Sequence, residues 1–207
     1  MLEKLIVIVE EESAEAALHC ILPKLLPASE FQIVRFQGKR DMLRKLLDRL
    51  RGFRSWLPDN YLLLVLVDRD RDDCRLLKER LESIAAQAGL ISKSAVPRGS
   101  QFQVVNRIAI EELESWYFGD WQAVQSAYPN VSPTIPNNQR YRDPDAIAGG
   151  TWEALERVFQ RSGYFESGLR KIELARSVAP HMEPARNTSR SFQVFRDAIT
   201  AGSALYG

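Results

Sequence analysis

Two long apolar segments that run straight into carboxylates constrain the fold of this chain more than any other feature. Residues 5–9 are apolar and rich in β-branched side chains, and Glu10 follows them directly. Residues 61–67 form a second such run, which ends at Asp68. Continuous apolar runs of this length are typical of strands buried on both faces of a parallel sheet. The sequence therefore predicts a parallel sheet with acidic side chains at the carboxyl ends of two strands.

The remaining segments alternate between strand and helix patterns. Further strands are predicted at residues 31–36, 90–96 and 104–110, and helices at residues 13–26, 41–53 and 73–88. This order favours an α/β fold with a mostly parallel sheet flanked by helices, which binds ligands beyond the carboxyl ends of its strands. We expect this domain to span residues 1–120, followed by a proline-rich loop over 121–150. An all-helical C-terminal extension is predicted over 151–207, with helices at 151–162, 168–179 and 190–201.

Composition and charge limit the classes of function. Apolar residues make up 45% of the chain and charged residues 27%, as in soluble globular proteins. The 28 basic and 27 acidic residues leave a net charge of +1, which excludes a protein that coats nucleic acid by bulk charge. Neither a membrane span nor a signal peptide is recognisable, so a cytoplasmic protein with no membrane partner is predicted. Two cysteines and two histidines are too few for a zinc site or Cys/His catalysis.

The carboxylates after the strands indicate a metal site. In an extended segment Asp68 and Asp70 would point the same way, and Glu10 would join them from a neighbouring strand. Such a cluster of hard oxygen ligands favours Mg²⁺ or Mn²⁺, which promote phosphoryl transfer. The alternative is a self-neutralised turn with a helix cap, because charges of opposite sign alternate from Asp68 to Asp72.

Three motifs in order resemble a known fold. The segments 9–10, 67–72 and 110–116 resemble the TOPRIM fold shared by topoisomerases, primases and the overcoming-lysogenization-defect nucleases. Over nearly its whole length the chain is similar to the bacterial family called domain of unknown function 4276. The resemblance implies a TOPRIM-like, Rossmann-like sheet. It also implies that Glu10 is a general base or metal ligand and that Asp68 and Asp70 bind metal, with Asp72 and Glu114 as further candidate ligands.

The chain departs from the TOPRIM pattern at one position. Glu11 stands where TOPRIM proteins usually have a glycine. Without that glycine the turn after the first strand must be wider or different, which weakens the case for catalysis.

The segment from Arg35 to Arg54 is locally basic. It holds eight basic residues against Asp41 and Asp48. The predicted nucleic-acid contacts are Lys39, Arg40, Arg44, Lys45 and Arg49. The alternative is an ordinary solvated helix face. We expect the four tryptophans, at 56, 116, 121 and 152, to pack in the core, and the polar residues 187–191 to cap the last helix.

Two classes of function stay open. The first is a Mg²⁺-dependent nuclease with Glu10, Asp68 and Asp70 as catalytic residues, acting on DNA or RNA. The second is a non-catalytic binding subunit, which Glu11 and the near-neutral charge favour. The family resemblance implies a partner ATPase of the ABC or structural-maintenance type, in phage defence or repair. The helical extension is predicted to dock that ATPase or a second copy of the chain as a homodimer.

Overall fold

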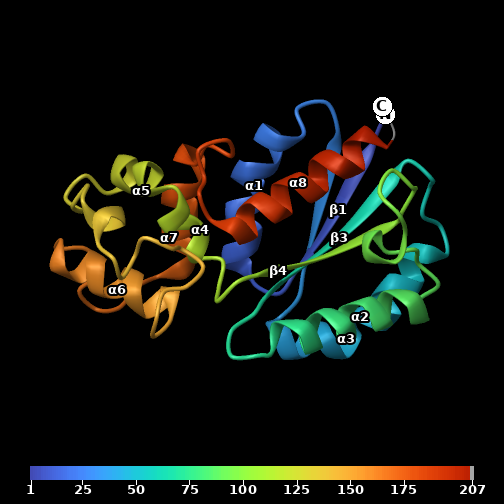
Figure 1. The fold of residues 1–207 in the computed structure, drawn as a ribbon, viewed down its shortest axis with the longest axis horizontal. Coiled ribbons are helices and arrows are strands. Elements are labelled where there is room, and N and C mark those ends of the chain that lie inside the picture. Colours follow the sequence, from blue (N-terminus) through green and yellow to red (C-terminus); the bar gives the residue numbers. More distant parts are fainter. Residues whose placement is uncertain (206–207) are drawn as a thin grey trace. The chain divides into compact units, whose positions relative to one another are not determined.

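The computed structural model describes residues 1–205 and contains a four-stranded sheet in the order β2-β1-β3-β4 (Figure 1). The strands are β1 Lys4–Val9, β2 Glu30–Arg35, β3 Tyr61–Asp68 and β4 Val104–Ala109. β1 pairs in parallel with both β2 and β3. The two apolar segments that run into acids are thus neighbouring strands in the middle of the sheet. The predicted mostly parallel α/β sheet is confirmed.

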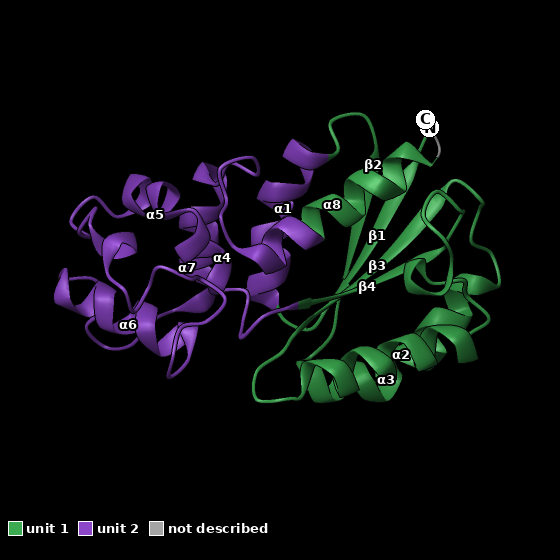
Figure 2. Cartoon of the chain, in the orientation of Figure 1, with its two compact units in different colours: residues 1–11, 26–108, 195–207 green, residues 12–25, 109–194 purple. Residues whose placement is uncertain are grey.

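Helices α2 (Lys39–Arg54) and α3 (Cys74–Gln87) lie on one side of this sheet, and residues 195–204 of α8 (Arg190–Ala204) lie on the other (Figure 2). The helix α3 begins where predicted, because the Asp73 carboxylate accepts the backbone N–H groups of Arg75 and Leu76. The core between the sheet and the two helices is mostly aliphatic. It is formed by Ile6, Ile8, Leu63 and Val65 of the strands, Met42, Leu46 and Leu50 of α2, and Leu77, Leu81 and Ala85 of α3.

The chain divides into two compact units, which Figure 2 colours separately. Unit 1 comprises residues 1–11, 26–108 and 195–207, and unit 2 comprises residues 12–25 and 109–194. The sequence-based division at 1–120, 121–150 and 151–207 differs from this one. The two compact units are each assembled from separate stretches of chain, and the division into consecutive segments stays a prediction. The last two residues of the predicted extension, 206 and 207, lie outside the described residues.

Unit 2 is built from helices. They are α1 (Glu12–Leu25), α4 (Ser115–Gly119), α5 (Trp121–Ala127), α6 (Thr151–Arg161), α7 (Lys171–Val178) and the first residues of α8. The helix α1 packs on α7, and Lys24 Nζ donates hydrogen bonds to the carbonyl oxygens of Pro180 and Met182. The three helices predicted after residue 150 are present. The segment predicted as a loop over 121–150 begins with α5 and includes a 3-10 turn at Ile135–Asn137.

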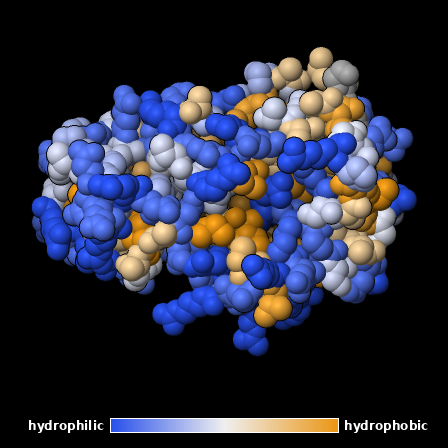
Figure 3. Space-filling view, viewed as in Figure 1, coloured by the Kyte–Doolittle hydropathy of each residue, from blue (hydrophilic) through white to orange (hydrophobic). Residues whose placement is uncertain are grey.

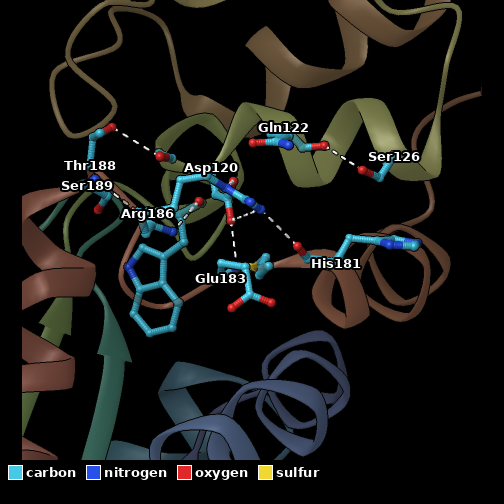
Figure 4. Close-up of polar contacts among 12 residues, drawn as sticks. Asp120, Gln122, Ser126, His181, Glu183, Arg186, Thr188 and Ser189 are labelled. Carbon is cyan, nitrogen blue, oxygen red and sulfur yellow. Dashed lines mark hydrogen bonds and ion pairs between the residues drawn. The ribbon is translucent and has the colours of Figure 1, made fainter.

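An ion pair between the buried Asp120 and the partly exposed Arg186 connects the C-terminal part of unit 2 to the start of α5. The Asp120 carboxylate, on a residue 1% exposed, accepts two hydrogen bonds from Arg186, from Nε at 2.6 Å and Nη2 at 3.0 Å. It also accepts the backbone N–H of Glu183 at 2.8 Å (Figure 4). All of these donors serve one carboxylate, so the charge of Asp120 is well compensated inside the protein.

The polar residues before α8 cap that helix, as predicted. Ser189 Oγ accepts the backbone N–H of Phe192 at 3.2 Å. The Asp145 carboxylate accepts hydrogen bonds from the hydroxyls of Ser189 (2.9 Å) and Ser191 (2.8 Å). Trp116 Nε1 in turn donates to Ser191 Oγ at 3.0 Å. These contacts connect Trp116, Asp145 and the start of α8 within unit 2.

The strand predicted at residues 90–96 is wrong. Ser92 forms a single parallel bridge with Val104, and the chain then makes a 3-10 turn over Lys93–Ala95. The polar pair Lys93 and Ser94 interrupts the apolar pattern, so the segment cannot bury both faces as a central strand does.

The helices and one face of the surface can be compared with the features of a membrane span. Within residues 1–205, every helix falls short of the length and apolarity that a membrane span requires. On the face shown in Figure 3, hydrophilic residues cover most of the surface and hydrophobic residues show in separate areas.

Candidate active site

The carboxyl ends of β1 and β3 bring Glu10 and Asp68 together, in unit 1. Because these strands are parallel neighbours, the residues that follow them emerge at the same edge of the sheet. Glu10 Oε1 accepts the backbone N–H of Asp68 at 2.6 Å. Glu10 is 7% exposed and Asp68 is 8% exposed. An acid at such an edge usually meets solvent, so the burial of both residues marks this edge as unusual.

Burial changes the acidity of Glu10. It raises the pKa of the Glu10 carboxyl from 4.5 to about 7. The hydrogen bond from the Asp68 N–H and the charge of Lys39 oppose this rise, and the negative charge of Asp70 adds to it. A carboxyl with a pKa near neutrality can both accept and release a proton at physiological pH.

The loop after β3 is turned rather than extended. The strand ends at Asp68, and Asp70 has a φ of +50°, in the left-handed region. The expectation that Asp68 and Asp70 share one face of an extended segment is therefore wrong. A left-handed residue reverses the local chain direction, and aspartate tolerates that conformation better than most side chains.

The ammonium group of Lys39 occupies the centre of this loop. Lys39 is the first residue of α2, and the Gly38 N–H before it donates to the Glu10 carbonyl oxygen at 2.7 Å. Lys39 Nζ donates to the carbonyl oxygens of Asp68 (2.7 Å) and Arg69 (2.9 Å). It also lies 3.1 Å from an Asp70 carboxylate oxygen and 2.6 Å from an Asp72 carboxylate oxygen. We call these four oxygens the oxygen cage.

The cage buries and holds the Lys39 charge. The Lys39 side chain is only 14% exposed. Burial lowers its pKa, but the hydrogen bonds to Asp72 and Asp70 outweigh burial and raise the pKa above its ordinary value. Lys39 thus faces the acidic loop, whereas the sequence analysis placed it among the residues that contact nucleic acid.

The donor set of this edge has the chemistry of a hard cation site. Carboxylate and carbonyl oxygens are the ligands that Mg²⁺ and Mn²⁺ prefer, and the Lys39 ammonium stands in for a cation among them. Across residues 1–205, no group of three or more His, Cys, Asp or Glu side chains is placed to hold a metal ion. These oxygens are of the kind that bind a divalent ion. In this structure they contact the positive charge of Lys39.

Glu114, the remaining candidate ligand, belongs to unit 2. It precedes α4 and is buried, and its Oε1 lies 3.4 Å from Lys171 Nζ. Lys171 also lies 3.6 Å from a Glu112 oxygen and sits 5.0 Å from the centre of the Trp152 ring. Within its own unit Glu114 is therefore part of a lysine-centred cluster. Its assignment as a metal ligand stays a prediction.

The other predicted nucleic-acid contacts lie along α2. Asp41 pairs with Arg44 at 2.7 Å and with Lys45 at 2.6 Å, and these hydrogen bonds lower the pKa of Asp41 to about 2. Arg40 and Arg49 are exposed and make no ion pair or side-chain hydrogen bond within residues 1–205. Asp41 thus neutralises part of the positive charge near the start of α2. Within residues 1–205, the charges of Arg40 and Arg49 are not balanced by an ion pair.

Trp56 is a surface residue that the sequence analysis placed in the core. Its side chain is 54% exposed, whereas Trp116 and Trp121 are buried as predicted. Trp56 follows the end of α2 by two positions, on the side of Lys45 and Arg49. The exposure of Trp56 could have been predicted from the sequence, because Trp56 lies at the end of the most basic helix and outside any apolar periodicity.

These features define an α/β protein with an acidic, lysine-bridged cluster at the carboxyl ends of two parallel strands. The chain belongs to the family described as Domain of unknown function (DUF4276), whose model matches residues 9–200. The family resemblance predicted from the sequence is confirmed. A solved structure, the C-terminal region of the Burkholderia pseudomallei OLD protein, is similar with 18% identity and a TM-score of 0.44. That match covers 96% of this chain and 100% of that chain. No curated protein matches the chain.

Proposed function

We propose that this protein is a divalent-cation-dependent phosphodiester hydrolase that acts on nucleic acid. The observation that supports it is the buried Glu10 carboxyl, with a pKa of about 7, beside the oxygen cage at the carboxyl ends of β1 and β3. A pKa near the working pH suits a general base that takes a proton from an attacking water. The basic face of α2 supplies cations for the phosphate backbone of a substrate.

The ion itself would be held by carboxylates of unit 1. Asp68, Asp70 and Asp72 are the proposed ligands, and Mg²⁺ or Mn²⁺ would supply Lewis acidity for attack on phosphorus. In the protein without a metal ion, Lys39 balances the negative charges of Asp70 and Asp72. Repulsion between these two carboxylates therefore does not open the loop. In this proposal Glu10 accepts the proton of the nucleophile at a carboxylate oxygen.

The experiment measures cleavage of linear, supercoiled and single-stranded DNA and of RNA, with Mg²⁺, Mn²⁺ or EDTA. We expect metal-dependent cleavage, and Asp70→Asn should lower it at least a hundredfold with little change in substrate affinity, because the metal acts mainly in the transition state. Glu79→Gln, at an exposed position on α3, is the matched control. Cleavage that survives in Asp70→Asn would show that the activity does not depend on the proposed metal site.

A second candidate function rests on the same cage. Because Lys39 already satisfies the loop oxygens, the acids can persist as structure in a non-catalytic binding subunit. Glu11 at the usual glycine position favours the same alternative. The assay should be repeated with a candidate ATPase partner. Absence of cleavage with every substrate, metal and partner would favour the binding subunit.

A further inference from the structure

A groove on α2 combines aromatic and basic side chains in unit 1. Its volume is about 540 Å³. Phe36, Phe53 and Trp56 supply its aromatic lining, and Lys45 and Arg49 supply its cations. Asp48 and Gly52 complete the lining. The groove is separate from the oxygen cage, because none of its lining residues belongs to the loop after β3.

Trp56 presents an aromatic surface to solvent at a fixed position. Its ring packs edge-on against Phe53, with centroids 5.7 Å apart, and against Tyr61, with centroids 6.4 Å apart. These contacts hold the ring while half of the residue stays exposed. Leaving a large aromatic side chain in water sacrifices its burial energy. A flat ring held in this way is the platform on which nucleic-acid bases stack.

The charges beside Trp56 suit a polyanion. Arg49 is exposed and makes no ion pair or side-chain hydrogen bond in the described part of the chain. Lys45 shares Asp41 with Arg44, so one carboxylate serves two cations. Asp48 faces Arg51 at 3.7 Å, a weak exposed pair. The groove is therefore flanked by positive charge in excess of negative charge.

Gly52 keeps the groove open without serving the packing of the protein. A glycine inside a helix costs about 1 kcal/mol relative to alanine. A Cβ built at Gly52 meets no atom of residues 1–205 within 4 Å, so the packing of the described residues does not require a glycine there. The open space above this residue is part of the groove lining. A ligand that approaches the helix backbone would account for it.

We propose that this groove binds an unpaired base of single-stranded nucleic acid against Trp56, while Lys45 and Arg49 contact its phosphates. A base in a duplex is stacked between its neighbours and cannot present its face to Trp56, so the groove selects single strands. This inference rests on the proposed function only in naming nucleic acid as the ligand. It adds a binding site away from the cleavage chemistry.

The test measures fluorescence anisotropy of labelled oligonucleotides in EDTA, where metal-dependent cleavage cannot occur. The probes are a single-stranded DNA, the same sequence as RNA, the matched DNA duplex and an abasic strand. We expect single strands to bind more tightly than the duplex and the abasic strand. Trp56→Ala should weaken single-strand binding roughly fivefold to a hundredfold, the range for loss of one stacked base. Trp56→Phe should retain most of the affinity.

Two further variants separate binding from folding. Gly52→Ala should leave stability equal or higher while weakening single-strand binding, because its methyl group enters the groove. Leu76→Ala removes another exposed apolar side chain, on α3, and should leave binding unchanged. Equal binding of single strands by the wild type and Trp56→Ala, or equal binding of the abasic and normal strands, would overturn the proposal.

The outcome is distinguishable from failure of the proposed function. Trp56-dependent binding in EDTA, without cleavage with any substrate, metal or ATPase partner, would support this groove and the binding subunit over the hydrolase. Metal-dependent cleavage with no effect of Trp56→Ala on single-strand binding would support the hydrolase and refute this groove.

Discussion

At the scale of single residues, Glu10 couples stability to pH. Between about pH 4.5 and 7 the unfolded chain loses the Glu10 proton while the folded protein keeps it, so stability falls as pH rises. Above pH 7 the ionisation of buried Glu10 lowers the free energy of unfolding by on the order of 3 kcal/mol. Glu10→Gln keeps an acceptor for the Asp68 N–H without the charge. In EDTA it should be more stable than the wild type at pH 8, with the advantage fading toward pH 5.

Denaturant unfolding at the two pH values measures this difference. Glu79→Gln serves as the control, because Glu79 is exposed on α3 and its neutralisation should not change the pH dependence. Equal gains for Glu10→Gln at pH 5 and pH 8 would show that Glu10 ionises normally in the folded protein.

Lys39 and a divalent ion should compete for the same oxygens. Lys39→Met keeps the length of the side chain and removes its charge, so Asp70 and Asp72 lose the cation that now balances them. We expect Lys39→Met to melt at a lower temperature than the wild type in EDTA. It should bind Mn²⁺ about tenfold more tightly by calorimetry, because the competing charge is gone. Unchanged Mn²⁺ affinity would mean that metal binds away from the cage.

At the scale of elements, the periodicity of the sequence predicts most helices and strands but not the loop geometry. The helix that begins after Asp73 follows from local rules of capping and apolar spacing. The left-handed turn at Asp70 and the reach of Lys39 into the loop depend on chain segments about 30 residues apart. Such long-range contacts leave no local pattern, so Glu10 and Asp68 could be predicted to meet while the cage could not.

The packing of α4 against residues 187–189 requires a glycine at position 119, at the end of that helix. A Cβ there would collide with the Asn187 side chain and lie 2.7 Å from the Ser189 backbone nitrogen. Gly119→Ala should therefore destabilise the protein by about 1–3 kcal/mol, the usual cost of overpacking. Thermal unfolding measures the loss. Gly52→Ala, in the open middle of α2, is the matched control and should be neutral or stabilising.

At the scale of the whole molecule, net charge and local charge make different predictions for nucleic-acid binding. The chain carries +1 overall, whereas α2 exposes Arg40 and Arg49, which have no ion-pair partner among residues 1–205. Reversing both to Glu changes the net charge by four units, from +1 to −3. If local contacts dominate, the slope of log K against log salt should fall by about 0.7 for each lost contact to a single strand.

The matched control changes the net charge by the same amount elsewhere. Arg75→Glu with Arg142→Glu also gives −3, from exposed positions on α3 and in unit 2. Anisotropy titrations of a single-stranded oligonucleotide in EDTA, at several salt concentrations, compare the two pairs. We expect the α2 pair to lower the magnitude of the slope of log K against log salt by about 1.4 in total. The control pair should leave this slope nearly unchanged. Equal losses in both pairs would show that the total charge of the molecule, and not α2, governs its attraction to nucleic acid.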